Sequence, residues 1–245
     1  MTQLADSADL LDRIYRHQRH LYDFTRKYYL PGRDRMIERL KPAAGESVLE
    51  IGCGTARNLV VAARRYPQTR FFGIDLSSAM LATAGRKIER TNLAPRIHVA
   101  RADATDFDPE RLFGVPEFSR IFLSYSLSMI DERRVVIESA LSRLAPGGEL
   151  HIIDFGGQEG LPRWFRPGFR RWLARFHVTP CDELEQDLHH IAARAGVRAT
   201  VERPYRGYTQ YAVCRRTSGP EILGVEYPPP GTCWAHGPCT LPPNS

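Results

Sequence analysis

The stretch VLEIGCGTARN (48–58) decides the fold of this 245-residue chain. It starts as a short apolar run that carries the acid Glu50 near its end, and it continues into Gly52 and Gly54. Glycine has no Cβ, so these two positions let the backbone turn sharply and approach a ligand closely. A helical pattern follows at once, and the first N–H groups of a helix have no partner within it. The stretch predicts a strand, a glycine turn and a helix N-terminus that face one cleft.

Further apolar runs continue this pattern along the chain, with helix-like stretches between most of them. The five runs are residues 47–52, 70–76, 96–104, 119–127 and 149–155. Strands that alternate with helices of roughly ten to fifteen residues are typical of a doubly wound parallel sheet. The nearly continuous apolar character of several runs suits a sheet that is covered on both faces. We expect an α/β fold of this kind.

The flanking segments divide the chain into three parts. Residues 1–45 have helical periodicity and are rich in arginine and tyrosine, which predicts a helical extension. Residues 46–216 form the expected main domain, in which 131–148 reads as a helix closed by Pro-Gly-Gly, 181–196 as a helix that ends at Gly196, and 199–216 as a hairpin. Residues 217–245 contain seven prolines and little periodicity, so we expect a disordered tail.

Composition narrows the class of protein. Hydrophobic residues make up 42% and charged residues 25%, as in soluble globular proteins. No stretch approaches the roughly 18 apolar residues that cross a bilayer, and the first residues lack the basic start of a signal peptide. We therefore expect a cytosolic protein. Its five cysteines are irregularly spaced, which does not predict a disulfide framework, and its net charge of +6 suits an anionic partner.

The glycine turn alone is compatible with several nucleotide-binding families. A dinucleotide-binding site has the pattern G-x-G-x-x-G, but here Arg57 stands at the third glycine position. The sequence also has no P-loop motif, which argues against a P-loop nucleotidase. The second run ends in Asp75, 25 positions after Glu50, where an acid can accept both hydroxyls of a ribose. The third ends in Ala-Asp-Ala (102–104), which is placed for an adenine amino group.

The set E-x-G-x-G-T, G-I-D-L-S and A-D-A, in this order, resembles the class I methyltransferases that use S-adenosylmethionine (SAM). The resemblance covers roughly residues 45–155 and implies a seven-stranded Rossmann-like sheet with SAM as co-substrate. It also implies a set of SAM-contacting residues. These are Glu50, Gly52, Gly54 and Asn58 at the methionine part, Asp75, Leu76 and Met80 at the ribose and pocket wall, Asp103 and Ala104 at the adenine, and Ser124 with Tyr125 where the methyl donor meets the substrate.

One position departs from that pattern. Ala56 stands where many such enzymes have glycine. Alanine suits this position if it lies in the first turn of the helix. If the backbone needs a positive φ here, alanine costs roughly 1 kcal/mol or more.

The acceptor of the methyl group is indicated by a second resemblance. The fourth strand run ends in SYSL rather than in the Pro-Pro turn of base methylases, so no nucleic-acid partner is expected. The pattern of Tyr15 to Arg33, with YRGYTQYAV near the C-terminus, resembles the BtaB family over residues 12–215. This resemblance implies three methylations of the homoserine amine of diacylglycerylhomoserine, which yield a betaine lipid. A methylase of phosphatidylethanolamine or another small amine is the alternative.

Such an acceptor carries a carboxylate and an amine. Arginine can hold a carboxylate in a two-pronged hydrogen bond, and Arg26 and Arg33 are the candidates. Aromatic faces attract a quaternary ammonium, which makes tyrosines candidates for a cage; they are Tyr22, Tyr28, Tyr29 and Tyr125, with Tyr208 and Tyr211 closing it. The same tyrosines could instead pack a helix on the sheet. His17 and His20 could accept the amine proton or lie on a surface.

The segment PRWFRPGFRRWLARF (162–176) combines five arginines with five aromatic side chains. This composition suits an interface with anionic lipid headgroups, although a lid packed on the core would also explain it. We expect reversible docking on the inner face of the membrane, testable by substitution of Trp172 and Arg171. A catalytically silent SAM-fold module that binds RNA is a further alternative. Cys233, His236 and Cys239 match no usual zinc spacing, and no metal is expected; the sequence does not decide the oligomeric state.

Overall fold

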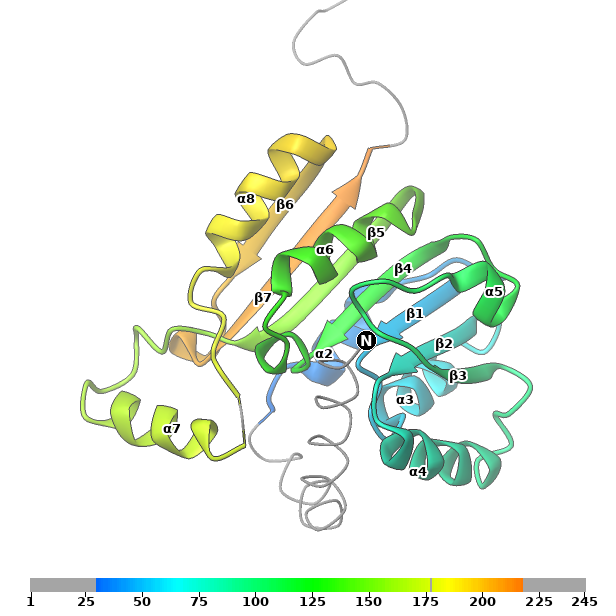
Figure 1. Cartoon of the computed structure of the whole chain (residues 1–245), viewed down its shortest axis with the longest axis horizontal. Helices are drawn as coiled ribbons and strands as arrows, with labels where there is room; N and C mark the ends of the chain where they lie inside the picture. The colour runs from blue at the N-terminus through cyan, green and yellow to red at the C-terminus, as the bar shows by residue number, and fades with distance from the viewer. Residues whose placement is uncertain (1–29, 177, 218–245) are drawn as a thin grey trace, which may run out of the picture.

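The computed structural model describes residues 30–176 and 178–217, which form one seven-stranded sheet between two helical layers (Figure 1). The strand order is β3-β2-β1-β4-β5-β7-β6. Strands β1 to β5 run parallel, and β7 is antiparallel to both of its neighbours. The strands are β1 (Ser47–Ile51), β2 (Arg70–Asp75), β3 (Ile97–Arg101), β4 (Phe118–Ser124), β5 (Leu144–Phe155), β6 (Val197–Glu202) and β7 (Thr209–Arg216). The predicted α/β fold is confirmed.

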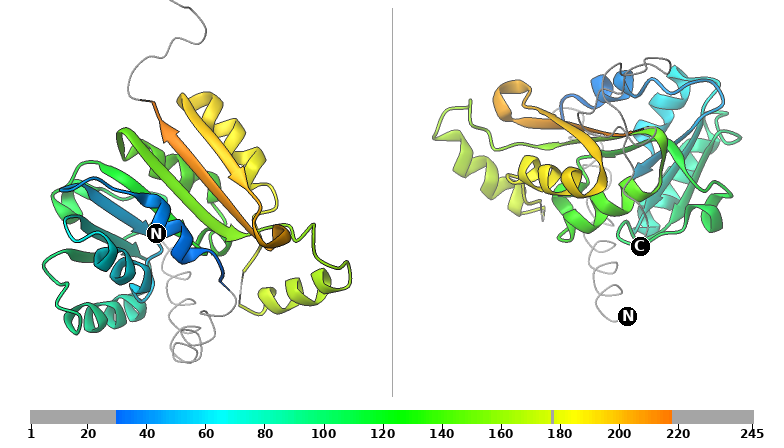
Figure 2. Two further views of the ribbon diagram at one scale, coloured as in Figure 1. Left: turned by 180° about the vertical axis from the view of Figure 1, so that it is seen from behind. Right: turned by 90° about the horizontal axis from the view of Figure 1, so that it is seen from above.

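Helices cover both faces of this sheet, as the end-on view in Figure 2 shows. One face carries α2 (Arg33–Leu40), α3 (Arg57–Arg65) and α4 (Ser78–Glu89). The other carries α5 (Pro109–Phe113), α6 (Arg133–Ser142) and α8 (Leu184–Ala195). Helix α7 (Phe165–Ala174) stands beside the sheet, past the end of β5 (Figure 1).

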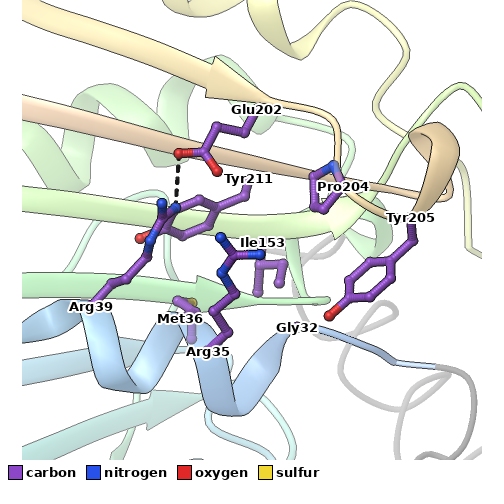
Figure 3. Close-up of a pocket in the computed structure, with 9 residues that line it drawn as sticks. All are labelled: Gly32, Arg35, Met36, Arg39, Ile153, Glu202, Pro204, Tyr205 and Tyr211. Carbon is purple, nitrogen blue, oxygen red and sulfur yellow. Dashed lines mark hydrogen bonds and ion pairs between the residues drawn. The ribbon is translucent and has the colours of Figure 1, made fainter.

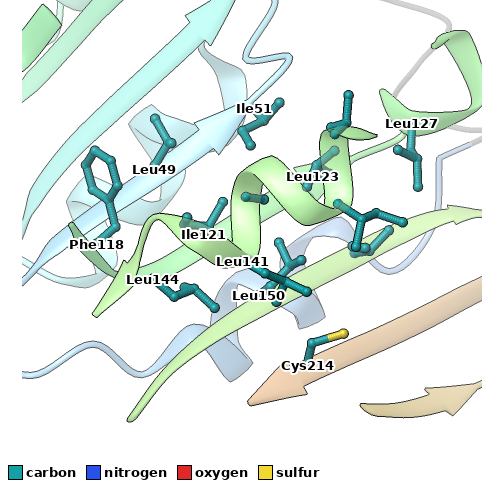
Figure 4. Close-up of a cluster of buried hydrophobic side chains, with 14 of the residues drawn as sticks. Leu49, Ile51, Phe118, Ile121, Leu123, Leu127, Leu141, Leu144, Leu150 and Cys214 are labelled. Atoms are coloured by element: carbon teal, nitrogen blue, oxygen red, sulfur yellow. The ribbon is translucent and has the colours of Figure 1, made fainter. Parts of the chain in front are cut away.

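Side-chain alternation along the central strands builds a separate core on each face. In β1, Leu49 and Ile51 belong to the α6/α8 core, and Val48 belongs to the α2/α3 core. Figure 4 shows the first core, where Leu49, Ile51 and Leu123 meet the leucines of α6 and β5. Full burial of such a side chain contributes about 2 kcal/mol. The sheet is therefore packed on both faces behind the strand ends that present the candidate site.

Two local elements differ from the sequence prediction. The helix expected over residues 131–148 ends at Ser142, because the Pro-Gly-Gly stretch belongs to the irregular start of β5, where pairing with β4 shifts between Phe118 and Arg120. A Cβ on Gly148 would lie 2.8 Å from the Ala145 carbonyl oxygen, so the glycine serves a β-bulge rather than a helix end. The short helix α5 was not predicted, because five residues are too few for apolar side chains to recur at helical spacing.

Candidate active site at the carboxyl ends of the parallel strands

The glycine turn after β1 lies at the sheet edge where β1 to β4 all end. Gly52 and Gly54 both have left-handed backbones, with φ of 73° and 53°. The Gly52 N–H donates to the Ile74 carbonyl at 2.9 Å, and the Gly54 N–H donates to Asp75 Oδ2 at 2.8 Å. The turn is therefore tied to the end of β2, which leaves a backbone cradle with no side chain at its two glycines.

Replacement of Gly52 by alanine is expected to destabilise the fold by roughly 2–4 kcal/mol. The new Cβ would lie 2.5 Å from the Ser126 Cβ, in addition to the strain of a positive φ. Gly45 is the matched control, because its φ is 83° and nothing lies within 4 Å of an added Cβ. Gly45→Ala should cost only the strain, about 1–2 kcal/mol. Equal losses for the two variants in urea unfolding would show that Gly52 is not sterically constrained.

Ala56 is the residue before α3 and has φ 59° and ψ 26°. Of the two alternatives left open by the sequence, the backbone therefore adopts the left-handed one, at a cost of roughly 1 kcal/mol for alanine. The residue is fully buried, and its methyl group packs in the α2/α3 core. The contacts of the methyl group offset part of that strain.

Glu50 is a buried acid with one satisfied oxygen. Its Oε1 accepts a hydrogen bond from Asn58 Nδ2 at 2.8 Å, whereas Oε2 has no partner among the described residues. Burial raises the pKa of Glu50 to about 8, against the lowering effects of the Asn58 hydrogen bond and the Arg33 charge. A buried acceptor without a partner is costly, so this oxygen is suited to a cationic ligand. The residues of the predicted methionine site therefore fit SAM.

Asp75 organises the loops that follow β1 and β2. Its Oδ2 accepts from Gly54, and its Oδ1 accepts from the Ser77 N–H at 2.9 Å. Its charge adds to the rise that burial causes in the pKa of Glu50. Leu76 follows directly, and Met80 in the first turn of α4 is buried against Met129 and Phe176. The predicted ribose and wall residues thus lie next to the glycine turn.

Asp103 and Ala104 follow β3, the next strand along the edge. Asp103 Oδ1 accepts from the Thr105 N–H at 2.8 Å and from Thr105 Oγ1 at 2.7 Å, which fixes the loop. Ala104 packs on the α6/α8 core. Ser124 ends β4, and its buried Oγ has no partner among the described residues. The strand order therefore lines up the predicted adenine, ribose and methionine positions along one edge.

Tyr125 is held in place by its hydroxyl group. The hydroxyl donates to the Pro31 carbonyl at 2.7 Å and so accepts from Thr209 Oγ1 at 2.9 Å. The ring is buried against Phe155, and the backbone is left-handed, with φ 55°. A substrate would meet this residue through its ring alone, and its cage role stays a prediction.

Tyr211 lies two residues inside the start of β7, with α2 over it. Its hydroxyl pairs with His151 Nδ1 at 2.7 Å, and His151 Nε2 pairs with Glu149 Oε2 at 3.1 Å. Burial lowers the pKa of His151, so the imidazole is neutral and Tyr211 donates to it. The Arg39 guanidinium covers the Tyr211 ring at 5.0 Å. A substrate ammonium would have to displace Arg39, so the cage role predicted for Tyr211 stays a prediction.

The remaining predicted acceptor residues are distributed between described and undescribed parts of the chain. Tyr22, Arg26 and Tyr29, with Tyr28, His17 and His20, lie outside the described residues, as do the tail beyond residue 217 and its cysteines. Arg33 opens α2, and its charge opposes the rise that burial causes in the pKa of Glu50 and of Tyr125. Arg33 therefore lies on the side of the sheet where Glu50 and Tyr125 are buried.

Two polar features of this region were not identified from the sequence. Arg57 donates to both Asp34 oxygens, at 2.5 and 3.2 Å, and so ties α2 to α3. Asp154 is fully buried near the end of β5 and accepts from the Ser128 and Phe155 N–H groups at 3.0 and 2.7 Å. Asp34 and Arg57 lie 23 positions apart in the sequence, so no local pattern indicates that they pair. Asp154 stands within an apolar strand run, and the sequence alone does not indicate its hydrogen bonds.

Helix α7 packs aromatic side chains against Phe155 and Tyr208. Phe169 contacts Phe155 and Tyr208, and Trp172 stacks on Phe169 and meets Phe176 edge-to-face. Trp164 is 79% exposed. Four arginines of the segment are also exposed, whereas Arg170 pairs with Asp182; the four are Arg163, Arg166, Arg171 and Arg175. The segment thus has a packed aromatic side and an exposed basic side.

Neither a metal cluster nor a membrane span was found in the described part of the chain. No group of three or more His, Cys, Asp or Glu side chains there could hold a metal ion. No helix formed by residues 30–176 or 178–217 is long and apolar enough to cross a bilayer.

Comparison with known proteins identifies the fold and the domain. A family model described as a methyltransferase domain matches residues 48–148, which contain the glycine turn and both acidic strand ends. This chain contains a methyltransferase domain. Phosphoethanolamine N-methyltransferase 2 of Haemonchus contortus, solved with SAM, superimposes with a TM-score of 0.66 at 19% identity over 86% of this chain and 60% of the other. The methyltransferase domain therefore has the fold of SAM-dependent class I enzymes.

Curated relatives of this methyltransferase domain include both N- and O-methyltransferases. A phosphatidylethanolamine N-methyltransferase of Cereibacter sphaeroides is 28% identical over 171 residues, 70% of this chain and 79% of the relative. A trans-aconitate 2-methyltransferase of Delftia acidovorans is 31% identical over 48% of this chain. An O-methyltransferase of Aspergillus nomiae is 29% identical over 62% of this chain. The chain spans 41% of the second relative and 66% of the third.

Proposed function

We propose that this chain is a SAM-dependent N-methyltransferase that converts diacylglycerylhomoserine to its N,N,N-trimethyl betaine lipid. The observation that carries the proposal is the strand-end edge of the sheet, where the half-satisfied Glu50 and the glycine turn lie next to Asp75. Bound SAM would supply an electrophilic methyl group on a sulfonium. Glu50 and Asn58 would hold its methionine part, Asp75 its ribose, and Asp103 with Ala104 its adenine.

The residues around the acceptor would act by placement rather than as acids or bases. Displacement needs a neutral amine in line with the methyl group, and alignment supplies most of the acceleration. Tyr125 and Phe155 form a rigid edge-to-face pair at the ends of β4 and β5. Aromatic faces attract a methylated ammonium without donating protons to it. The ammonium proton would leave to water before the next transfer.

Support for a lipid acceptor comes from α7 and from the resemblance of residues 12–215 to the betaine-lipid enzymes. Exposed Trp164 and four exposed arginines suit the interface of an anionic bilayer, whereas the packed aromatic side of α7 lies against Phe155 and Tyr208. The same helix would thus dock on the membrane and lie beside the candidate site. We place the working enzyme on the inner face of the membrane, reversibly bound through anionic headgroups.

Phosphatidylethanolamine is the second candidate acceptor, because the Cereibacter sphaeroides relative that acts on it aligns with 70% of this chain. The two lipids differ in the group near the amine, a carboxylate in one and a phosphate in the other. Incubation of the protein with SAM and each lipid, followed by mass spectrometry, separates the candidates. Methylation of phosphatidylethanolamine alone would replace the first proposal by the second.

A further inference from the structure

The chain just past α7 reaches the residues predicted to line the SAM site. Asp75 Oδ1 accepts from the Ser77 N–H at 2.9 Å, and Ser77 Oγ accepts from the Met80 N–H at 3.3 Å. Met80 is therefore held in place relative to Asp75. Its buried side chain packs against Met129 and against Phe176, which lies two residues past the end of α7. Phe176 thus contacts the predicted wall of the SAM site from a distant part of the sequence.

An aromatic stripe along α7 connects Phe176 with the exposed start of the helix. Its members recur at intervals of four, three and four residues, which places them on one helical face; they are Phe165, Phe169, Trp172 and Phe176. Successive ring centroids lie 5.3, 5.8 and 5.1 Å apart. At the far end, Trp164 is 79% exposed and contacts Phe165. Ring contacts therefore run without a break from the predicted membrane-facing end to the SAM wall.

The segment that carries α7 is fixed at both of its ends. Three backbone N–H groups at its start donate to the carbonyls of residues 206–208, at 2.8 to 3.1 Å; the donors are Gly156, Gln158 and Gly160. In the same turn, the Tyr205 ring lies close to Gly32 at the start of α2, as Figure 3 shows. After α7, the Thr179 N–H donates to the Ser128 carbonyl at 2.8 Å. Both attachment points thus belong to the body of the protein.

Between these two attachments, α7 is held by few buried contacts. Of the ten residues of this helix, all of which the structure describes, Leu173 alone is buried. Arg170 pairs with Asp182 at 2.6 Å, but partly exposed ion pairs of this kind contribute little. Elements with few buried contacts change position at a low cost in free energy. The end of α7 can therefore either pack on Met80, as it does here, or move away from it.

We propose that Phe176 is a positioning residue of the SAM site, and that through Phe176 α7 couples SAM binding to membrane docking. This inference rests on the proposed function, in which the exposed basic side of α7 binds anionic headgroups. A bilayer that holds this outer side would keep the aromatic stripe turned inward, with Phe176 on Met80. SAM would favour the same arrangement, because it completes the wall of the site. By thermodynamic linkage, each ligand then strengthens the binding of the other by an equal factor.

The full chain, SAM and phosphatidylglycerol vesicles without an acceptor lipid test this coupling. SAM is expected to tighten vesicle binding roughly 5- to 10-fold, and saturating vesicles should tighten SAM binding by the same factor. Phe176→Ala should abolish both effects and leave vesicle binding without SAM unchanged, because the exposed side of α7 is intact. Phe176→Leu keeps an apolar side chain against Met80 and should retain most of the coupling. A residue that only stabilised the fold would not separate these readouts.

Phe113→Ala is the matched control. Phe113 is another half-buried phenylalanine, in α5 on the other face of the sheet, where its ring centroid lies 5.1 Å from that of Phe72. This variant should keep the full coupling. If the unsubstituted protein bound neither vesicles nor SAM, or only one of them, the proposed function and this inference would both be overturned. Binding of both without any mutual effect, or a Phe176→Ala variant that keeps the coupling, would overturn the inference alone.

Discussion

Replacement of Glu50 by glutamine is expected to weaken SAM binding by roughly 10- to 100-fold. The carboxylate is buried, and the partner that its Oε2 lacks among the described residues would be the cationic methionine part of SAM. Loss of one charge-assisted hydrogen bond of about 1.5–3 kcal/mol gives a change of this size. Calorimetric titration at pH 9, where a carboxyl with a pKa of about 8 is ionised, measures it. An unchanged affinity would mean that Glu50 does not face the ligand.

The same substitution is expected to stabilise the ligand-free protein in a pH-dependent way. The folded-state pKa of Glu50 is about 8, above its ordinary value of 4.5, so the native state binds the proton more tightly than the unfolded chain does. Stability therefore falls as pH rises from about 4.5 to about 8. Glutamine removes this loss, so Glu50→Gln should gain roughly 4–5 kcal/mol at pH 8.5 and almost nothing at pH 4.5.

Glu149→Gln is the control with the opposite sign. Glu149 lies at the other end of the sheet and is paired with Arg215 and His151, and these partners lower its pKa to about 2. The contribution of Glu149 to the stability of the folded state is present above pH 4.5 and is lost as pH falls toward 2. Glu149→Gln should cost roughly 2 kcal/mol at pH 7, because charged partners lose their acceptor, while SAM affinity stays unchanged. Urea unfolding measures the change in the free energy of unfolding for each variant. If both substitutions changed it in the same direction, Glu50 would not be the buried acid with a raised pKa that we describe.

A variant that removes the exposed basic side of α7 should lose membrane binding by roughly 100- to 1000-fold. It combines Trp164→Ala with glutamine at the four exposed arginines of the segment, namely Arg163, Arg166, Arg171 and Arg175. Each arginine near an anionic surface contributes about 1 kcal/mol. Sedimentation with vesicles that contain phosphatidylglycerol measures the loss. The structure makes Trp164 a better target than Trp172, which is packed against Phe169 and Phe176.

A charge-matched control separates a docking surface from general attraction. Glutamine at four other exposed arginines changes the net charge equally; these are Arg64, Arg86, Arg111 and Arg194. This control should lose far less vesicle binding, and both variants should keep their SAM affinity, which shows that they are folded. Equal losses in the two variants would show that net charge alone governs binding.

Much of the fold could be predicted because its signals are local. The run 48–58 contains the strand, the turn and the helix start, and Asp75 and Asp103 follow further strands directly. Parallel strands place their carboxyl ends at one edge, so these acids converge without any long-range information. Gly196 also behaves as expected, and ends α8 with φ 63°.

The features that were not predicted depend on contacts between distant segments. Arg39 covers Tyr211 from 172 positions away along the chain, which gives that tyrosine its place under α2. The conformation of Ala56 was undecided because alanine is compatible with both alternatives. Pro-Gly-Gly (146–148) is a common helix terminator, yet here it forms a bulge whose cause is the close approach of the Ala145 carbonyl.

The central claim is methyl transfer to the amine of diacylglycerylhomoserine, and the direct measurement is mass spectrometry of that lipid after incubation with the protein and SAM. We predict products that carry one, two and three added methyl groups, with the trimethyl product accumulating over time. Recovery of only unmodified lipid, from a preparation that binds SAM in calorimetry, would contradict the account.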